Sequence, residues 1–468
     1  MNVSTDLGQD LKSRRAYDLR AMKRPDSARW FWWGLVVVAV GALAIRLAYI
    51  LVSRQHIQFG GDAFFYHGGA NLLADGKGFI SPFHPNRAVK ASEHPPLYML
   101  YLAIPSLFGF QSQLTHLIWS AILGVGTVVV IGLTGREIGG TRLGLIAAAL
   151  AAAYPNMWIP DGSLMIESMA IFATAVAVYL AYRCWREPSW WRLAAVGAAS
   201  GAAALSRSEL ILMVPFMVVP LGLMAKQLSR PQRWIGIGAG VLASLIVMAP
   251  WLVFNLTRFE KPELLTSSTG LLLAATNCDD IWRSEHQSYF SIQCTYDIRR
   301  QKVPPGLDQS EEDVIYRDAA IRYIKGHTDL IPGVVAARVG AILGVYQPSL
   351  QIQIDGVIEG RGRTLARAGM YSFYAMALLS VAGAIALRRR RSAPVFPLLV
   401  PPAMVLITVV LTYASTRFRA SAEVSLCILA AVAIDAAINA VQARRSASQT
   451  VAGSVDADRQ PELAPEPV

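Results

Sequence analysis

The sequence contains ten apolar stretches that approach or exceed the length needed to cross a lipid bilayer. A hydrocarbon core of about 30 Å takes about 20 apolar residues of helix. Hydrophobic residues make up 54% of the chain and charged residues only 16%, a balance that excludes an ordinary soluble protein. We therefore predict an all-α polytopic membrane protein of about ten transmembrane helices, of which 142–158 and 191–206 are short and could be tilted or re-entrant. The predicted spans are residues 30–52, 113–134, 142–158, 163–183, 191–206, 209–226, 234–254, 367–387, 394–413 and 421–441.

The net charge of +11 follows from the expected topology rather than from a nucleic-acid partner. Basic residues occupy every second connection between the predicted spans, as the positive-inside rule requires. We therefore expect both termini in the cytoplasm and the two long loops outside. The alanine- and arginine-rich composition points to a bacterium, and so to its plasma membrane. The basic residues that set this orientation are Arg14, Arg15, Arg20, Lys23, Arg24, Arg29, Arg136, Arg142, Arg183, Arg186, Lys226, Arg230, Arg233, Arg388, Arg389, Arg390, Arg391, Arg444 and Arg445.

This topology divides the chain into five regions. Apolar residues 97–110 and 333–347 lie in the long loops and fit interfacial helices beside the membrane. Residues 310–313 read Ser-Glu-Glu-Asp, a capping-box-like start to an amphipathic helix. The regions are a cytoplasmic basic N-terminus (1–29), a transmembrane core (30–254) that includes the first long loop (53–112), the second long loop (255–366), C-terminal transmembrane helices (367–441) and a disordered cytoplasmic tail (442–468).

Two of the four cysteines, Cys278 and Cys294, lie in the second long loop, where an oxidising compartment permits a disulfide. Closing so short a loop would contribute about 3 kcal/mol in the chain-entropy model. Free thiols are the alternative, and a zinc site lacks a further His or Cys pair nearby. Cys184 and Cys427 belong to spans or span ends, where we expect inert core residues.

The first long loop combines an acid, aromatic residues, glycines and a Glu-His-Pro-Pro turn in an otherwise apolar chain. Asp62 is followed by aromatic residues, which should hold its carboxylate in the loop at the interface, where a carboxylate can act as a general base; the alternative is a solvated turn residue. The prolines at 95–96 fix the backbone after His94, which could donate a hydrogen bond to phosphate or be a structural surface histidine. Glu93 and Lys77 are secondary candidates.

Arginines lie at the outer ends of later spans, against the positive-inside bias. Arg417 and Arg419 flank Phe418, and in an extended segment both guanidinium groups would point the same way. Arginine forks match phosphate oxygens bidentately, which favours a clamp for a lipid phosphate over snorkelling to headgroups. Arg207 is a further candidate for the same phosphate, or else it forms a local ion pair with Glu209.

Charged residues at membrane depth cost about 2.5–3.5 kcal/mol each, so they usually mark function. Glu167, near the start of the fourth span, is expected to pair with one of the arginines, or else to contact an acceptor. Arg46 is expected to snorkel outward from the first span. The predicted topology brings one set of charged residues to the outer face: Asp62, Glu93, His94, Asp161, Glu167, Arg207, Glu209, Arg258, Arg417 and Arg419.

The sequence lacks several motifs that would indicate other chemistry. It has no Walker A motif, no nucleotide-binding Gly-x-Gly-x-x-Gly unit and no serine nucleophile elbow. The inside connections are too short to build a nucleotide site. Arginines that await a phosphate on the outside therefore predict an activated group carried on a lipid phosphate.

These residues together resemble the GT-C superfamily of integral-membrane glycosyltransferases, in particular bacterial protein O-mannosyltransferases and lipid A aminoarabinose transferases. The family pattern is an essential Asp in a long first loop, a Gly-rich segment, and a Lys-Pro or His-Pro-Pro turn before a juxtamembrane helix. The chain departs from it at Ala63, where the mannosyltransferases carry Glu, and at His94 and Arg207, where the aminoarabinose enzymes carry Lys. The matching positions are Asp62, Glu167 and residues 76–78, 93–98, 155–156, 205–207, 277–279 and 417–419.

The resemblance implies a GT-C-like bundle with extracytoplasmic juxtamembrane helices. It also implies an inverting hexosyl- or pentosyltransferase that moves a sugar from a polyprenyl-phosphate donor to an acceptor hydroxyl or amine. Asp62 would take the acceptor proton. No nucleotide cofactor is required, no metal site is predicted, and a divalent cation is optional. The phosphate would be held by His94, Arg207, Arg417 and Arg419.

The expected partners are the donor, membrane lipid and an acceptor that could be a glycan, a lipid or a protein. Two rival functions remain open from the sequence: a transporter or lipid flippase, and a non-enzymatic scaffold that binds lipid phosphate. Catalysis requires Asp62, His94, Arg207 and Arg417 to converge on one site, whereas a scatter of these residues around the rim would favour the rivals.

Overall fold

The computed structural model describes residues 25–57, 59–84 and 87–457. Within these residues the regular structure is helical, apart from an isolated antiparallel bridge between Ile80 and Lys90. The helices are α2 (Pro25–Tyr49), η1 (Ile50–Arg54), α3 (Gly61–Ala74), α4 (Leu97–Leu107), α5 (Gln113–Gly139), α6 (Thr141–Ala153), α7 (Pro155–Trp158), η2 (Pro160–Gly162), α8 (Glu167–Arg186), α9 (Trp190–Ala204), η3 (Ser208–Leu212), η4 (Val214–Val218), α10 (Val219–Met224), α11 (Arg230–Arg258), α12 (Thr269–Thr276), α13 (Asp279–Trp282), α14 (Ile292–Lys302), α15 (Gln309–Gly326), η5 (Thr328–Leu330), α16 (Ile331–Ile342), α17 (Pro348–Gln353), η6 (Ile354–Ile358), α18 (Arg363–Arg390), α19 (Phe396–Leu411), η7 (Thr416–Arg419) and α20 (Ala420–Ala457).

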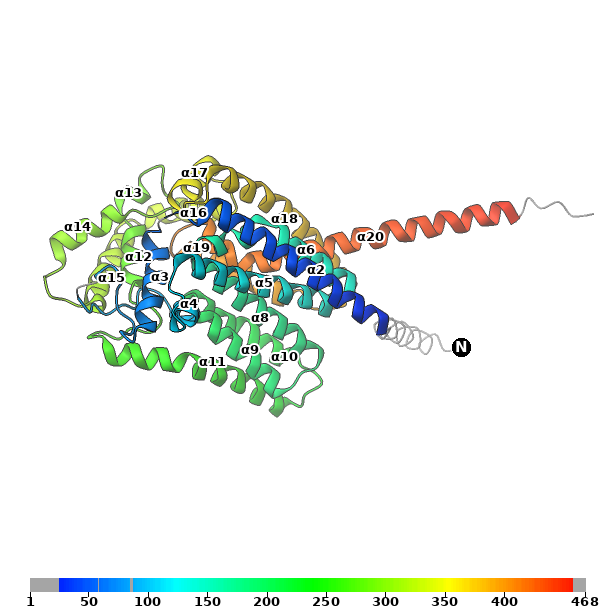
Figure 1. Cartoon of the computed structure of the whole chain (residues 1–468), viewed down its shortest axis with the longest axis horizontal. Coiled ribbons are helices and arrows are strands. Elements are labelled where there is room, and N and C mark those ends of the chain that lie inside the picture. The colour runs from blue at the N-terminus through cyan, green and yellow to red at the C-terminus, as the bar shows by residue number, and fades with distance from the viewer. Residues whose placement is uncertain (1–24, 58, 85–86, 458–468) are drawn as a thin grey trace, which may run out of the picture.

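Long helices form a bundle along the long axis of the molecule, and the helices of the two long loops gather at one end of it (Figure 1). This loop end carries α3 and α4 from the first long loop and α12 to α15 from the second. The start of α2 and the end of α20 lie at the opposite end (Figure 1). Residues far apart in sequence therefore meet at the loop end.

Every predicted span is helical, so the all-α polytopic class is confirmed, while the total of ten remains a prediction. The bent pair α6 and α7–η2 turns by 75° and counts as a further span if its two halves cross together. Segments 209–226 and 394–413 form shorter apolar helices, and 191–206 forms α9. Among the described residues, six helices are long and apolar enough to cross a membrane alone: Arg29–Arg54, Gln113–Gly139, Glu167–Arg186, Arg230–Arg258, Arg363–Arg390 and Thr416–Ser446.

Small residues allow the bundle helices to approach closely. A Cβ atom added to Gly197 of α9 would lie 1.8 Å from the carbonyl oxygen of Gly240 on α11. A Cβ at Gly383 of α18 would meet the carbonyl oxygen of Leu429 on α20 at the same distance. Within a bilayer, helix association depends on such close packing because lipid tails are as apolar as the side chains.

The expectation of a disordered tail from residue 442 is wrong for part of that segment. Helix α20 continues without a break to Ala457. Alanine, arginine and glutamine are frequent just beyond residue 440 and have high helix propensity, which explains the continuation. The remainder of the predicted tail (458–468) and most of the basic N-terminus (1–24) lie outside the described residues.

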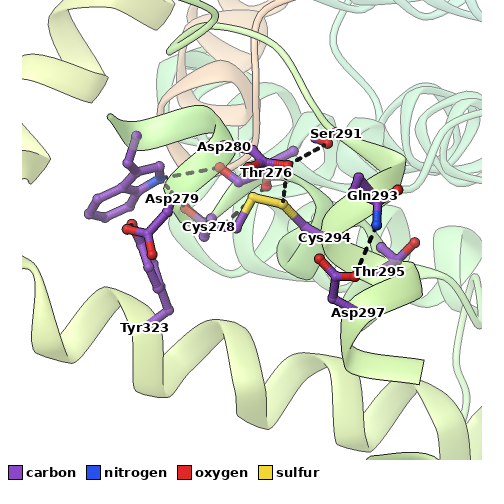
Figure 2. The surroundings of a disulfide bond; sticks show 12 residues. Thr276, Cys278, Asp279, Asp280, Ser291, Gln293, Cys294, Thr295, Asp297 and Tyr323 are labelled. Carbon is purple, nitrogen blue, oxygen red and sulfur yellow. Dashed lines mark hydrogen bonds between the residues drawn. A yellow bond between two sulfur atoms is a disulfide. The ribbon is translucent and has the colours of Figure 1, made fainter. Parts of the chain in front are cut away.

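The second long loop folds into short helices, two of whose ends are joined by the expected disulfide. Cys278 precedes α13 and Cys294 lies in α14, and the two sulfur atoms are bonded (Figure 2). Nearby, the indole nitrogen of Trp282 donates to the carbonyl oxygen of Thr276 at 3.2 Å. Helix α15 is present as predicted, although Asp308 rather than Ser310 caps it.

Hydrogen bonds fasten the second long loop to the Glu-His-Pro-Pro turn of the first. The backbone N–H of Ser267 donates to the carbonyl oxygen of Ser92 at 2.8 Å, and the Ser268 hydroxyl donates to the carbonyl oxygen of Glu93 at 2.7 Å. The amide of Gln309 donates to the Glu93 carboxylate at 2.6 Å. The second long loop thus holds the two residues that precede His94.

Candidate functional site

Asp62 lies in the first turn of α3, not in a loop as expected from the sequence. Gly60 is the N-cap residue, and Gly61 has a φ of +54°, a conformation that glycine adopts without a Cβ penalty. The two glycines therefore start the helix sharply rather than extend a loop. A carboxylate in the first turn is favoured by the unpaired N–H groups at the helix N-terminus. The Asp62 side chain keeps 34% of its surface exposed.

His94 contacts Asp62 from the proline-stiffened turn. Its Nε2 atom lies 3.6 Å from Asp62 Oδ1. The imidazole packs against the rings of Phe65 and Tyr66, each with its centroid 5.3 Å away. The turn ends at Pro96, which is the N-cap of α4, so the prolines lead directly into the predicted juxtamembrane helix.

Arg417 lies at the centre of the site and contacts three carboxylates. Its Nη2 donates to Asp62 Oδ2 at 3.0 Å, and its Nε donates to Glu167 Oε1 at 2.8 Å. Its Nη1 lies 3.5 Å from Glu359 Oε2. One guanidinium group therefore joins the first long loop, the start of α8 and the second long loop.

Arg207 shares Glu167 with Arg417. Its Nη1 donates to Glu167 Oε1 at 2.9 Å, and its Nε donates to Glu209 at 2.6 Å. The structure therefore contains both features expected of Arg207. It forms a local ion pair with Glu209, and it lies beside Arg417 through their shared partner Glu167. Glu167 pairs with two arginines, whereas the sequence suggested one. We call the group formed by Asp62, His94, Glu167, Arg207, Glu209, Glu359 and Arg417 the Asp62 cluster.

The Asp62 cluster contains more acid than base. Four carboxyl groups face two guanidinium groups and one imidazole. Burial by itself would raise the pKa of Asp62, but the interaction with His94 and the charge of Arg417 outweigh it and hold that pKa well below its ordinary value. Burial raises the pKa of Glu359, although Arg417 opposes the change. Arg207 is paired with two carboxylates and Arg417 with three in this conformation.

Buried polar atoms without a hydrogen-bond partner surround the cluster. Glu167 Oε2, the Tyr66 hydroxyl and the Tyr289 hydroxyl have no partner although all three are buried. Charges in the cluster act on both tyrosines, because Arg417 lowers their pKa values against the larger effect of burial, which raises them. Buried polar groups are normally hydrogen-bonded, so three such atoms at one place mark a site with unused binding capacity.

Arg419 does not join the Asp62 cluster, which corrects the expected pair of phosphate-binding arginines. Residues 416–419 form the 3-10 helix η7 rather than an extended strand. In a 3-10 helix, residues two apart point about 240° apart, so the two side chains diverge. Arg419 packs over the Phe373 ring at 3.9 Å and lies 3.6 Å from Glu423, inside the bundle.

The secondary candidates Lys77 and Glu93 also lie outside the cluster's contacts. Lys77 is exposed and lies 3.9 Å from Asp75. Glu93 binds Gln309 and positions the turn, as described above. Arg46 does not snorkel outward; it is fully buried and donates to Asp161 at 2.7 Å.

Sequence reasoning missed Glu359 entirely. It follows η6 and stands before Gly360, whose φ of +63° turns the chain back. The Arg54 side chain donates to the carbonyl oxygens of Gly162 and Gly360, which holds this turn against the bundle. The only signal in the sequence is an acid before a Gly-Arg-Gly run, which is too common to single out.

The described residues contain no group of three or more His, Cys, Asp or Glu side chains arranged to hold a metal ion. The site consists of guanidinium, imidazole, phenol and carboxyl groups. Such a set can bind an anionic group through arginine, and it can accept or donate protons.

Part of the chain matches a known protein family. Residues 93–254 match the dolichyl-phosphate-mannose-protein mannosyltransferase family. This range contains His94, Glu167 and Arg207 but neither Asp62 nor Arg417. No curated protein sequence matches the chain.

Among solved structures, the chain resembles the oligosaccharyltransferase AglB from Archaeoglobus fulgidus in complex with an inhibitory peptide and a dolichol-phosphate. The identity is 14% and the TM-score 0.53, over 91% of this chain and 52% of that one. The apo form of the Archaeoglobus fulgidus enzyme matches at 12% identity and a TM-score of 0.52, over 90% and 52% of the two chains. ArnT from Cupriavidus metallidurans bound to undecaprenyl phosphate matches at 13% identity and a TM-score of 0.42, over 86% and 78%.

The chain thus spans about half the length of the archaeal oligosaccharyltransferase structures that it resembles. The expected resemblance to the GT-C superfamily of membrane glycosyltransferases is confirmed at the level of the fold. The protein is a multi-pass membrane protein with that architecture.

Proposed function

We propose that this chain, which has the GT-C fold, is a membrane glycosyltransferase. It transfers a hexose or pentose from a polyprenyl-phosphate donor to a hydroxyl or amine on an acceptor. The reaction takes place at the loop end, on the extracytoplasmic side of a bacterial plasma membrane, with both termini in the cytoplasm. The observation that carries the proposal is the convergence of Asp62, His94, Arg207 and Arg417 from four separate segments.

The two arginines of the Asp62 cluster are the proposed phosphate ligands. A guanidinium group binds phosphate oxygens bidentately and stays charged, so it can stabilise the leaving phosphate as negative charge develops. Because all three nitrogens of Arg417 face carboxylates, we expect the donor phosphate to displace at least one carboxylate from it. Asp62 and Glu359 are the candidates, since Glu167 is shared with Arg207.

Displacement from Arg417 would prepare Asp62 for its proposed role. While His94 and Arg417 together hold its pKa low, Asp62 is a poor base; once phosphate neutralises Arg417, the carboxylate regains part of its proton affinity. The acceptor oxygen or nitrogen then attacks the anomeric carbon, and its proton passes to Asp62. The bond from that carbon to the phosphate oxygen breaks, and the phosphate keeps the electron pair. A single displacement inverts the anomeric centre.

The chain's own residues supply every group that this mechanism uses. No nucleotide is involved, and a divalent cation is optional in this mechanism. The family match over residues 93–254, and the fold shared with a structure that contains a dolichol-phosphate, support a donor of this chemical class. The sugar and the acceptor are not specified by these similarities.

The test is sugar transfer from radiolabelled polyprenyl-phosphate donors in membranes that contain the wild type or Asp62→Asn. We expect the wild type to consume a mannosyl, glucosyl or arabinosyl donor and the variant to lose about 10²–10⁴-fold in rate. Detergent melting of both proteins checks that the variant is folded.

Asp75→Asn is the matched control. It makes the same chemical change at the other end of α3, where Asp75 is exposed, and should leave transfer unchanged. Equal donor consumption by wild type and Asp62→Asn would remove Asp62 from the chemistry. Transport of intact donor across vesicles, without transfer, would favour a flippase instead.

A further inference from the structure

An exposed pair of aromatic rings lies beside the Asp62 cluster. Phe64 of α3 and Phe83 of the following loop have ring centroids 5.4 Å apart, and 37% and 46% of their respective surfaces are exposed. Phe83 also stacks against Phe65 at 6.4 Å, and Phe65 meets His94 edge-on at 5.3 Å. Aromatic contacts therefore run from His94, the neighbour of Asp62, out to the surface.

The local structure explains why this pair is not part of the core. Phe65 and Tyr66 follow Asp62 by three and four residues, so they share its side of α3, and both are buried. Phe64 points away from that side. Gly68 lets the loop approach, because a Cβ there would lie 2.7 Å from Cβ of Pro82. Pro82 thereby brings Phe83 onto Phe64.

The surroundings of the pair are polar and open. Gly60 and Gly61 are exposed, with nothing within 4 Å of a Cβ built on either. His84 and Arg87, in the same loop as Phe83, are exposed. Neither ring belongs to a helix that could span the membrane. A lipid acyl chain, which needs continuous apolar surroundings, therefore fits this place poorly.

We infer that Phe64 and Phe83 form a stacking subsite for a saccharide, and that the acceptor is a glycan. This inference rests on the proposed function. A sugar ring has an apolar C–H face and a polar rim, and the negative face of an aromatic ring attracts such C–H groups. Binding sites for small molecules combine aromatic surface with a few polar groups in this way.

Two double variants separate stacking from general apolar contact. Phe64→Leu with Phe83→Leu keeps apolar side chains but removes the flat rings, whereas Phe64→Tyr with Phe83→Tyr keeps the rings. Phe108→Leu is the matched control, since Phe108 is a highly exposed aromatic residue at the end of α4.

The measurement is saturation-transfer NMR on the purified full chain in detergent, with mannobiose, cellobiose and a serine- and threonine-rich peptide as probes. We expect a disaccharide signal for the wild type, the tyrosine pair and Phe108→Leu, and about tenfold weaker binding for the leucine pair. Absence of any disaccharide signal, equal signals in the leucine pair, or a signal from the peptide alone would overturn the inference.

A mannosyl-phosphoryl-polyprenol donor added to the same samples distinguishes the two possible sources of the sugar. Persistence of the disaccharide signal supports an acceptor subsite, whereas its loss by competition assigns the rings to the donor sugar and overturns the acceptor assignment. Binding needs no turnover, so the result is independent of the transfer assay. Disaccharide binding without donor consumption would contradict the proposed transferase activity but would still support a saccharide-binding site at the two rings.

Discussion

Two of the groups of buried charges in the described structure differ in their bonding. Arg46 and Asp161 form a one-to-one pair that is almost completely shielded from solvent. The remaining donors of Arg46 reach the carbonyl oxygens of Ala42 and Met157 at 3.2 Å. The Asp62 cluster instead has four carboxyl groups for two arginines, an exposed part of Asp62, and buried atoms without partners.

This difference separates a structural pair from a site that can accept a ligand. In a balanced pair with satisfied donors, any added group would have to break an existing bond. In the Asp62 cluster, several carboxylates compete for the same guanidinium nitrogens, so an incoming anion can replace one without leaving an arginine unpaired. Both groups combine residues distant in sequence, and only the second has unused bonding capacity.

The largest expected effect concerns the structural pair. Asp161→Ala leaves Arg46 as an uncompensated buried cation, and we expect a loss of about 3–5 kcal/mol in the free energy of unfolding. Denaturation in detergent measures the loss. Transfer per folded molecule should be unchanged. A specific loss of transfer in protein of normal stability would mean that this pair also serves the reaction.

The next effect concerns the arginine at the centre of the Asp62 cluster. Arg417→Gln removes a cation that we place on the leaving phosphate, so transfer should fall by about 10²–10³-fold. Arg419→Gln, two residues further on, should retain transfer per folded molecule because Arg419 contacts Phe373 and Glu423 instead. Comparable losses of transfer in both variants, normalised to folded protein, would restore Arg419 to the phosphate site.

The disulfide tests how far the loop end depends on the second long loop. Replacing both Cys278 and Cys294 by Ser should cost about 3 kcal/mol by the chain-entropy model. Because neither cysteine takes part in the ion pairs or hydrogen bonds of the Asp62 cluster, transfer at low temperature should persist and be lost at a lower temperature than in the wild type. Thermal inactivation of the two proteins measures the shift. An immediate loss of activity in the cold would instead tie the disulfide to the site.

The smallest expected effect is a shift in pH dependence. Because the pKa of Asp62 is held low, its carboxylate stays charged as the pH falls through about 3.9, the ordinary value for Asp, and any stability from its ion pair is lost only below that. Protonation of Asp62 should therefore not lower the wild-type kcat/KM at that pH, so the pH profile should lack an acid limb there. In Arg417→Gln the residual activity should acquire an acid limb closer to the ordinary value. Identical acid limbs would show that Arg417 does not control Asp62.

Much of the architecture was predictable because a membrane-spanning helix can be recognised from its own stretch of sequence. Apolar length marks each span, and charge alternation orders the spans. Asp62, His94, Arg207 and Arg417 were also identified from chemistry that is costly at the membrane. The errors arose where local pattern was ambiguous: residues 416–419 fit an extended segment as well as a 3-10 turn, and Arg46 fits snorkelling as well as burial.

The sequence by itself determined whether each segment lies in lipid or in water, because hydrophobicity and charge are properties of the individual residues. It therefore specified a polytopic helical protein with polar loops rich in reactive groups. Only the tertiary structure decided which charges meet. Glu359 reaches Arg417 from a distant loop, and a 3-10 turn points Arg419 elsewhere. Ion pairing falls off steeply with distance, so the partners of a charge depend on packing that no single segment encodes.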